Sequence, residues 1–545
     1  MKKITRSALC GKDSLGRVFE PTDTVPQKRN RKVGIFYLTW HLESNGFTSN
    51  PGFFEDVLDS YDVETLGSPD SPFFDYKYGS SFYWGMPLFG RYRSNDEWTV
   101  RRHIELLTLA DIDFLVVDAT NSLCYLEEYL VLMKVIDESL KAGIPAPKVT
   151  FYTNTDSGTR VRQIYDGIYS KGLYKDTWFT INGKPMIIGN DYEVSPELID
   201  FFHFKNSVWP NAEHDDKKDL YNRNNAFPWI DFGKQHIYTT KDGKESVMSV
   251  STAQNSDPKT ACFGENYLRG TFGSHGRSFH DGKPNITKDS YKYGFNFSEQ
   301  WKIARKADPD MIHITGWNEW VAGVWRMNKE NPVAIYDCLN AEYSRDIEPM
   351  KDGYGDAYYQ LMIDEIRLYK GIDKDSITLP VRYENPSTAA IQRRTKTPDG
   401  LIKDDSLRSV ITACEVKKED GLYVFSAETK DDIDIDDKIG DKMRLYVNTK
   451  VPGGFEYCFN MRAVDNQKTA AAKREDGRWK RLCLTDYVID GKKIELKIPE
   501  ALFENEDTVY FKWVDSRVPC HNNNDFYLYG SVAPLGGLYY KIKLK

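Results

Sequence analysis

Cysteine is scarce and scattered in this chain. Its 545 residues include eight cysteines that stand singly, with no CxxC pair and no spacing typical of a zinc site. This pattern excludes a disulfide-stapled scaffold and predicts buried free thiols instead. The histidines do not cluster at metal-ligand spacing either, so we expect neither a metal nor a cofactor.

Long apolar runs and an excess of positive charge are also missing. No window of 18 apolar residues is present, so we expect no membrane-spanning helix. The formal net charge of -8 argues against a nucleic-acid partner, which would require a basic surface to neutralise phosphates. The basic residues near the N-terminus are not followed by an apolar segment, so they form no complete signal peptide. We therefore expect a cytoplasmic protein, or a periplasmic or secreted one if a leader was trimmed.

Several motifs of nucleotide and calcium chemistry are absent. No GxGxxG motif follows the first apolar run, and we find no phosphate loop and no serine nucleophile elbow. The acidic run Asp431–Asp437 lacks the glycine and the glutamate that a calcium loop requires at its sixth and twelfth positions. We interpret this run as a solvated loop or edge strand.

Aromatic residues, in contrast, are abundant. They make up 14% of the chain, with 34 tyrosines, 28 phenylalanines and 12 tryptophans. One interpretation is that these rings fill the cores. The other is sugar binding, because pyranose rings present apolar C–H faces that pack on aromatic rings.

The first two thirds of the chain alternate short apolar runs with amphipathic stretches. Continuous apolar strands alternating with helices are typical of a parallel sheet covered on both faces, and about 340 residues favour a (β/α)8 TIM barrel. The predicted strands are Val33–Trp40, Phe114–Ala119, Val149–Asn154, Pro185–Gly189, Trp229–Phe232, Ser246–Thr252 and Met311–Trp317. The predicted helices are Glu97–Ala110, Leu126–Ala142, Thr159–Ser170, Ser298–Ala307 and Asp356–Lys370.

The last third has a different pattern, in which short alternating runs are separated by turn signals such as Pro452-Gly453-Gly454. Alternation with such turns is typical of an all-β sandwich. We therefore predict an α/β barrel followed by a C-terminal all-β sandwich. The predicted boundaries are a lead-in over residues 1–30, the barrel over 31–371, a polar linker over 372–405 and the sandwich over 406–545.

Polar clusters follow most of the predicted barrel strands. The carboxyl ends of barrel strands form one rim, where active sites are built. One strand leads directly into Asn318-Glu319-Trp320, so that a carboxylate is bracketed by an amide and by indoles. An apolar wall raises the pKa of a carboxyl group, while an amide orients it or binds a sugar hydroxyl. Glu319 is therefore our first catalytic candidate, and the alternative is a structural cap packed between tryptophans.

Further candidates follow the other strands. Asp118 comes after four apolar residues, and we interpret it either as a second catalytic carboxylate or as a hydrogen-bonded structural residue. Arg277 and His280 lie in a glycine-rich loop that either clamps a ligand or forms a turn. His313, within an apolar strand, is interpreted as a satisfied core residue. The predicted substrate-binding residues of the rim are Trp40, His41, Glu43, Asn154, Asp156, Asp191, Trp317, Asn318 and Trp320, with the tryptophans as a stacking wall.

Residues 30–371 resemble the family 99-type, endo-α-mannosidase-like glycoside hydrolases. They also resemble a related group of polysaccharide-cluster proteins described as glycosyltransferases, and the barrel-plus-sandwich hydrolase-like proteins of gut bacteria. The matching elements are Gly34-Ile35-Phe36-Tyr37, Trp317-Asn318-Glu319-Trp320, Ile347-Glu348-Pro349 and Tyr354-Gly355-Asp356-Ala357-Tyr358-Tyr359. The C-terminal part is similar to family 9-like carbohydrate-binding modules in Met443–Asn448, Phe455-Glu456-Tyr457 and Val514-Asp515, the alternative being a purely structural sandwich.

The resemblance implies a glycoside hydrolase that cleaves an oligo- or polysaccharide, with Glu319 as one catalytic group. The chain departs from the family at Ala322, where the family has a second glutamate. A glycosidase needs one group to protonate the leaving oxygen and another to act as nucleophile or base. The candidates for the second carboxyl are Asp118, Asp156, Glu43, Asp346 and Glu348, of which we favour Asp118 and Glu348.

Two other functions are consistent with the same residues. A non-catalytic sugar-binding protein would explain the alanine at position 322, and a buried salt bridge at Glu319 would favour it. A glycosyltransferase would use the same carboxylates on an activated donor, for which no dedicated phosphate site is visible. The sugar, its linkage and the oligomeric state stay open.

Overall fold

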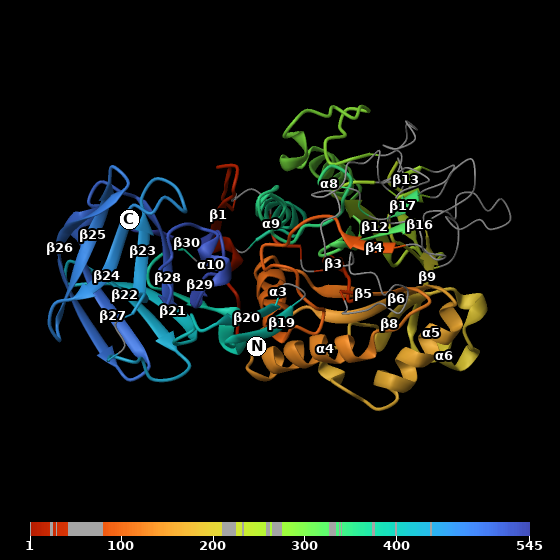
Figure 1. Ribbon diagram of the computed structural model, residues 1–545, viewed down its shortest axis with the longest axis horizontal. Helices are drawn as coiled ribbons and strands as arrows, with labels where there is room; N and C mark the ends of the chain where they lie inside the picture. The colour runs from red at the N-terminus through yellow and green to blue at the C-terminus, as the bar shows by residue number, and fades with distance from the viewer. Residues whose placement is uncertain are drawn as a thin grey trace.

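The computed structural model places a mixed α/β region beside a region of antiparallel strands, with β1 and α9 between them (Figure 1). It describes residues 2–21, 26–28, 30–41, 80–209, 225–231, 234–254, 256–257, 262–263, 275–325, 334–336, 338, 340–372, 377–397, 400–436 and 439–545. No helix within these ranges is long and apolar enough to cross a membrane.

A nearly closed, barrel-like parallel sheet forms the α/β region. Its parallel strands are β3 (Lys32–Tyr37), β5 (Phe114–Asn121), β6 (Lys148–Thr155), β8 (Lys184–Gly189), β9 (His203–Val208), β10 (Ala226–Pro228), β12 (Ser246–Ser251) and β15 (Met311–Thr315). They are ordered around the sheet as along the chain, and β15 returns to pair with β3. The predicted parallel α/β architecture is confirmed. A TIM barrel stays a prediction, because the described residues show no ladder between β10 and β12.

Short strands accompany this sheet. The antiparallel β11 (Tyr238–Thr239) lies at its edge beside β12, and β7 (Thr180–Ile181) pairs with β8. A separate sheet contains β4 (Ser80–Tyr83), β16 (Val321–Trp325) and β17 (Ala334–Tyr336), and β13 (Ser256–Asp257) pairs with β14 (Cys262–Phe263). The strand predicted over 229–232 is wrong in position. The strand ends at Pro228, because the chain then turns where Asp231 accepts hydrogen bonds from His236 N–H and Tyr238 Oη.

Hydrogen bonds that involve side chains connect β10 and β12, which share no ladder within the described residues. Asp231, just after β10, donates its N–H to Ser249 Oγ of β12 over 3.1 Å, and Ser249 Oγ lies 3.0 Å from Asp231 Oδ2. His313 Nδ1 of β15 lies 2.9 Å from the Pro228 carbonyl oxygen. The ring of His313 is fully buried, and burial lowers its pKa to about 4, so this histidine is neutral. His313 is therefore a buried, neutral residue whose ring connects the end of β10 to β15.

Helices cover the outside of the parallel sheet. They are α3 (Glu97–Leu109), α4 (Leu126–Lys141), α5 (Ser157–Ile164), α6 (Pro196–Phe201), α8 (Phe295–Ala307) and α9 (Ala357–Lys370). Successive strand residues point to opposite faces. In β5, Phe114 and Val116 belong to the inner cluster, whereas Leu115 and Val117 pack with the helices. By the same alternation Asp118 faces the barrel interior.

The antiparallel strands form a large second sheet. They are β18 (Val381–Glu384), β21 (Ile411–Glu419), β22 (Leu422–Thr429), β23 (Asp441–Asn448), β24 (Tyr457–Ala463), β25 (Lys468–Glu475), β26 (Arg478–Asp490), β27 (Lys493–Pro499), β28 (Thr508–Ser516), β29 (Ser531–Ala533) and β30 (Leu538–Lys543), with β1 (Leu9–Lys12) and β2 (Val18–Phe19) at one edge. A short helix, α10 (Asp525–Leu528), lies between β28 and β29. β1 pairs with β30, so both ends of the chain meet in this sheet.

The segment between the two regions is packed against both. β18 pairs with β21, while the hairpin of β19 (Arg393–Thr397) and β20 (Gly400–Asp404) lies against α3. Arg393 donates to Asp96 Oδ2 over 2.9 Å and stacks over Trp98, whose N–H is capped by the same aspartate. The predicted domain boundaries themselves stay a prediction.

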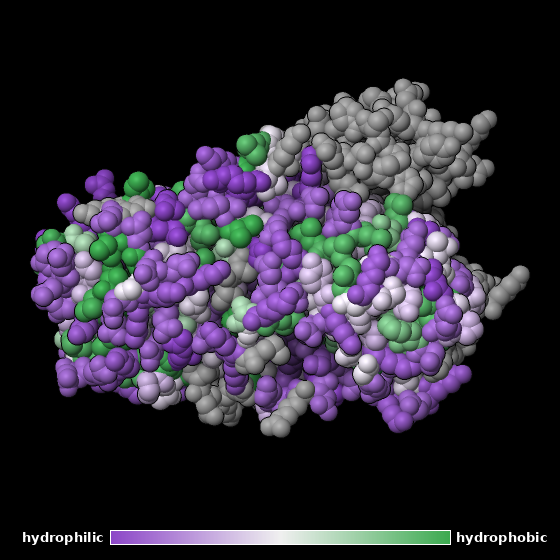
Figure 2. Space-filling view, turned by 90° about the horizontal axis from the view of Figure 1, so that it is seen from below, coloured by the Kyte–Doolittle hydropathy of each residue, from purple (hydrophilic) through white to green (hydrophobic). Residues whose placement is uncertain are grey.

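The surface seen in Figure 2 is largely hydrophilic, and its apolar residues form separate small groups. Exposed apolar side chains such as Leu401 and Ile439 lie on the antiparallel region or beside it. Scattered apolar residues of this kind are usual on protein surfaces and need no ligand to explain them.

An ion-paired group lies at the amino end of the barrel. Glu245, in front of β12, pairs with Lys205 of β9, and His203 Nε2 lies 3.1 Å from the same carboxylate. The hydrogen bond from His203, together with Lys205, lowers the pKa of Glu245 to about 2 against the opposing effect of burial. Lys205 is only 2% exposed, so its charge depends on this partner.

We expect Glu245→Gln to destabilise the protein at pH 7 by about 3–5 kcal/mol, because it leaves the buried Lys205 ammonium unpaired. Since the native pKa of Glu245 lies below its unfolded value, this contribution is present above about pH 4.3 and is lost as the pH falls towards 2. Denaturant titration from pH 7 to pH 3 measures both effects. Asp200→Asn is the control, because the Asp200 carboxylate is 91% exposed, and equal losses in both variants would contradict the prediction.

Candidate active site at the carboxyl end of the barrel

Glu319 lies just beyond the carboxyl end of β15, on the way to β16. Its side chain is 5% exposed, and its Oε2 lies 2.5 Å from Nη2 of Arg345, which is fully buried. The Arg345 guanidinium also stacks over the Trp229 ring at 4.8 Å. The guanidinium therefore supplies the positive charge that a carboxylate needs when it is removed from water.

Asp346 is a second carboxyl group at the same place. Its Oδ1 accepts the backbone N–H of Glu319, and the side chain is fully buried. Burial raises the pKa of Asp346 to about 7, against the lowering effects of Arg277 and of the bond from Glu319. Two neighbouring carboxyl groups thus lie in different environments: Glu319 faces a cation, and Asp346 is protonated in a large fraction of molecules at neutral pH.

An aromatic stack continues from the ion pair. Trp209, which follows β9, stacks on Trp229 with 4.4 Å between the ring centroids and 22° between the planes. Trp209 is partly exposed, whereas Trp229 is buried against Phe36 of β3. The stack therefore leads from a partly exposed indole to the guanidinium that holds Glu319.

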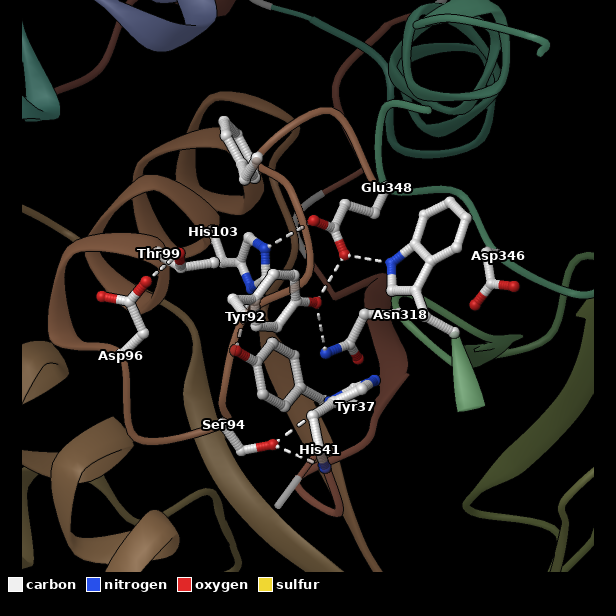
Figure 3. Close-up of polar contacts among 12 residues, drawn as sticks. Tyr37, His41, Tyr92, Ser94, Asp96, Thr99, His103, Asn318, Asp346 and Glu348 are labelled. Atoms are coloured by element: carbon white, nitrogen blue, oxygen red, sulfur yellow. Dashed lines mark hydrogen bonds and ion pairs between the residues drawn. The ribbon is translucent and has the colours of Figure 1, made fainter. Parts of the chain in front are cut away.

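Glu348 lies at the centre of a buried hydrogen-bond network (Figure 3). Its Oε2 accepts from Tyr92 Oη and from Trp320 Nε1, each over 2.6 Å, and its Oε1 lies 3.1 Å from His103 Nε2. Tyr37 Oη lies 2.9 Å from the other nitrogen of His103. The Glu348 side chain has no solvent exposure. It therefore lies beneath the predicted rim.

The residues on either side of Glu319 are buried as well. Asn318 Oδ1 accepts the Leu38 N–H over 2.9 Å and its Nδ2 donates to the Leu38 carbonyl over 3.1 Å, which ties the loop to the end of β3. Trp317 packs against His103. Trp320 stacks on Trp84 with 5.1 Å between the ring centroids. All three residues were predicted to bind a ligand, and all three are buried in contacts within the protein.

The end of β3 supplies one partly exposed ring. Trp40 is partly buried and packs on the inner cluster. His41 is 1% exposed, its Nδ1 lies 3.1 Å from Ser94 Oγ, and burial lowers its pKa to about 3. His41 is therefore an uncharged packing residue in this structure. Glu43 lies outside the described residues.

Two acidic candidates, Asp118 of β5 and Asp156 after β6, contact side chains close to them in the chain. Asp118 is 2% exposed, and its Oδ1 accepts from the N–H and the hydroxyl of Thr120. Asp156 is 49% exposed and pairs with Arg160 over 2.8 Å at the start of α5. Asp191 is exposed in a short 3-10 turn, and Asn154 Oδ1 accepts from Ser207 Oγ over 2.9 Å.

Arg277 connects the glycine-rich loop to the candidate site. Its guanidinium is fully buried, lies over the rings of Tyr354 and Tyr358 at 4.6 and 4.2 Å, and donates to the Asp346 carbonyl over 2.7 Å. His280 bonds within its own loop, with Nδ1 2.9 Å from the Ser278 carbonyl. Arg277 therefore braces the backbone that carries Asp346.

Sequence reasoning missed several of these residues. Arg345 stands directly before Asp346 in the printed sequence. An arginine next to two acidic candidates is the signal that could have identified it. Trp209 gave no such signal, because it follows a strand that the sequence pattern did not predict. Tyr92 and His103 gave none either, since their contacts with Glu348 join segments more than 200 residues apart.

Among the comparisons with known proteins, the search of solved structures gives partial matches. No protein-family model matches the chain, and none of the curated proteins does. Two solved structures of the GH99 endo-alpha-mannosidase from Bacteroides thetaiotaomicron are similar over 62% and 63% of this chain. The first, a complex with bis-tris-propane, is 16% identical, is covered over 97% of its length and has a TM-score of 0.33. The second is 16% identical, is covered over 98% and has a TM-score of 0.34.

These structures belong to the enzyme family that the sequence resembles. At such TM-scores the spatial agreement is too low to assign a function, so the function is inferred below from the site itself.

We expect Arg345→Met to destabilise the protein by about 3–5 kcal/mol at pH 7, because it removes the buried guanidinium that pairs with the Glu319 carboxylate. Denaturant titration measures the loss. Arg162→Met is the control, because Arg162 pairs with Glu197 at a site where the two side chains are 39% and 69% exposed. A loss no larger than that of the control would show that Glu319 does not depend on Arg345.

Proposed function

We propose that this protein is a glycoside hydrolase that cleaves a glycosidic bond in an oligo- or polysaccharide. The observation that supports the proposal is the pair Glu319 and Asp346. The two are joined through the Glu319 N–H, and one faces a guanidinium while the pKa of the other is raised to about 7. Glycosidases depend on two carboxyl groups in different environments, one that is protonated and one that is ionised at the working pH.

The two groups have different roles in the proposed reaction. Asp346, as the protonated acid, transfers its proton to the glycosidic oxygen while the bond from this oxygen to the anomeric carbon breaks. Glu319 either attacks the anomeric carbon or takes a proton from the attacking water. In the first case water then breaks the bond from Glu319 to the anomeric carbon, its hydroxyl group ends on that carbon and its proton returns to Asp346. In the second case the water attacks the anomeric carbon directly, and solvent takes the proton from Glu319 and restores the one lost by Asp346.

Asp346 fits the second role better than the other candidates. The carboxylate of Asp118 accepts two hydrogen bonds from Thr120, and that of Asp156 is paired with Arg160 and half exposed. Glu348 is enclosed by Tyr92, Trp320 and His103. The Asp346 carboxylate contacts Glu319 directly, by accepting the Glu319 N–H.

The aromatic residues provide the binding surface in this proposal. Trp209 offers a partly exposed indole above Trp229, and Trp40 offers another at the end of β3. We infer that the sheet is a (β/α)8 TIM barrel with its site at the carboxyl ends of the strands, and that a sugar ring stacks on Trp209.

A second candidate function is sugar binding without cleavage. The observation that favours it is the buried ion pair itself, since a Glu319 carboxylate engaged by Arg345 is occupied by a structural partner. The alanine at position 322, where the resembling family has a second glutamate, points in the same direction. In this case the site would bind an oligosaccharide through Trp209 and release no product.

A glycan panel distinguishes the two functions. We expect the protein to release product from one class of plant, yeast or host glycan, and Glu319→Gln and Asp346→Asn each to lower kcat by at least about 1,000-fold, in line with the loss of a catalytic group. Asp200→Asn is the control and should keep kcat, because the Asp200 carboxylate, in α6, is 91% exposed. Glycan binding without product from the unaltered protein would support the second function, and full activity of Glu319→Gln would contradict the first.

The pKa of Asp346 predicts a pH dependence of the reaction. Because the acid must be protonated, kcat/KM should fall about tenfold for each pH unit above pH 7. Initial rates measured from pH 5 to pH 9 test this. A rate that stays level or rises between pH 7 and pH 9 would exclude Asp346 as the proton donor.

A further inference from the structure

We propose that Glu348 is a positioning residue that fixes the Glu319 loop from both sides. This inference rests on the proposed role of Glu319, and it deepens that proposal by assigning Glu348 to support rather than to the chemical step. It follows from the contacts of the network shown in Figure 3.

One oxygen of Glu348 holds both neighbours of Glu319. Oε2 accepts directly from Trp320 Nε1 over 2.6 Å. The same oxygen accepts from Tyr92 Oη over 2.6 Å, and Tyr92 Oη in turn accepts from Asn318 Nδ2 over 3.2 Å. Glu319 stands between Asn318 and Trp320 in the chain. Its backbone is therefore held through its two neighbours by a single carboxylate.

The backbone near Glu348 adds to this support. The Glu348 N–H donates to the Trp317 carbonyl over 2.9 Å, and the Glu348 carbonyl accepts from Tyr354 Oη over 3.1 Å. The ring of Tyr354 also lies against the Arg277 guanidinium, which donates to the Asp346 carbonyl. The segment containing Asp346 and Glu348 is thus fixed at both acidic residues.

His103 supports the other oxygen of Glu348. Its Nε2 lies 3.1 Å from Oε1, and Tyr37 Oη lies 2.9 Å from its Nδ1. His103 and Glu348 are both without solvent exposure, and the rings of Tyr92, Phe89 and Trp317 pack around the imidazole. A buried carboxylate whose Oε2 accepts two hydrogen bonds and whose Oε1 lies beside a histidine is held in one place, which is what a positioning group requires.

Tyr92→Phe is the sharpest test, because it removes the single hydroxyl that links Glu348 to Asn318. Tyr369→Phe is the matched control: it also removes a buried hydroxyl that donates to a carbonyl, that of Pro309 in front of β15, at the opposite end of the barrel. We expect Tyr92→Phe to lower kcat about 10- to 100-fold with KM changed less than threefold, and Tyr369→Phe to leave both unchanged.

Glu348→Gln is the conservative variant. Its amide oxygen still accepts from Tyr92 and Trp320, and its amide nitrogen donates to the imidazole in the opposite tautomer. We therefore expect it to keep kcat within about fivefold of the unaltered protein, whereas Glu319→Gln is inactive. Loss of activity in Glu348→Gln as severe as in Glu319→Gln would overturn the proposal and make Glu348 a catalytic residue.

A measurement without substrate separates this proposal from the proposed function. Hydrogen–deuterium exchange of the amides of residues 317–321 should become at least about tenfold faster in Tyr92→Phe and stay unchanged in Tyr369→Phe. This result supports the positioning role even if no glycan is cleaved. Unchanged exchange in Tyr92→Phe, or equal acceleration in both variants, would overturn it.

Discussion

A carboxyl group that leaves water must recover its lost solvation from cations and hydrogen-bond donors, and three such groups are buried side by side near the carboxyl end of β15. Each is compensated differently. The Glu319 carboxylate pairs with the Arg345 guanidinium. Asp346 accepts the Glu319 N–H, and its raised pKa favours the neutral form. Glu348 is enclosed by Tyr92, Trp320 and His103. The contacts of these carboxyl groups therefore join β15, α3 and the loop that carries Tyr92.

The barrel-like sheet makes this cluster possible because it brings distant segments to one end. Asn318 ties the loop after β15 to the end of β3, and Arg345 reaches the inner cluster through Trp229. The open junction between β10 and β12 is bridged by Asp231 and Ser249 near this same end. The site and the closure of the sheet therefore both depend on the short segment after β10, which carries Trp229 and Asp231.

The sequence pattern predicted the parts of this arrangement that depend on local order. Continuous apolar runs identified most of the strands, and Glu319 stood out because a carboxylate between indoles follows one of them. Trp317 and Trp320, which we expected to form a stacking wall for a ligand, are buried instead. The sequence pattern could not predict this, because a tryptophan next to a polar residue has the same pattern whether its ring faces a ligand or a core. The contact of Tyr92 with Glu348 spans 256 residues of sequence, and only tertiary packing creates it.

The alanine at position 322 changes how a second carboxyl reaches the site. In the resembling family both acidic groups follow the same strand, so local spacing sets their relation. Here Asp346 comes from 27 residues further along and meets Glu319 through a backbone hydrogen bond. The position of the Asp346 carboxyl relative to Glu319 then depends on what holds the Asp346 backbone. Arg277 does so, braced by Tyr354 and Tyr358, two tyrosines of the fourth element that carries the resemblance. Packing around Arg277 therefore sets how Asp346 lies relative to Glu319.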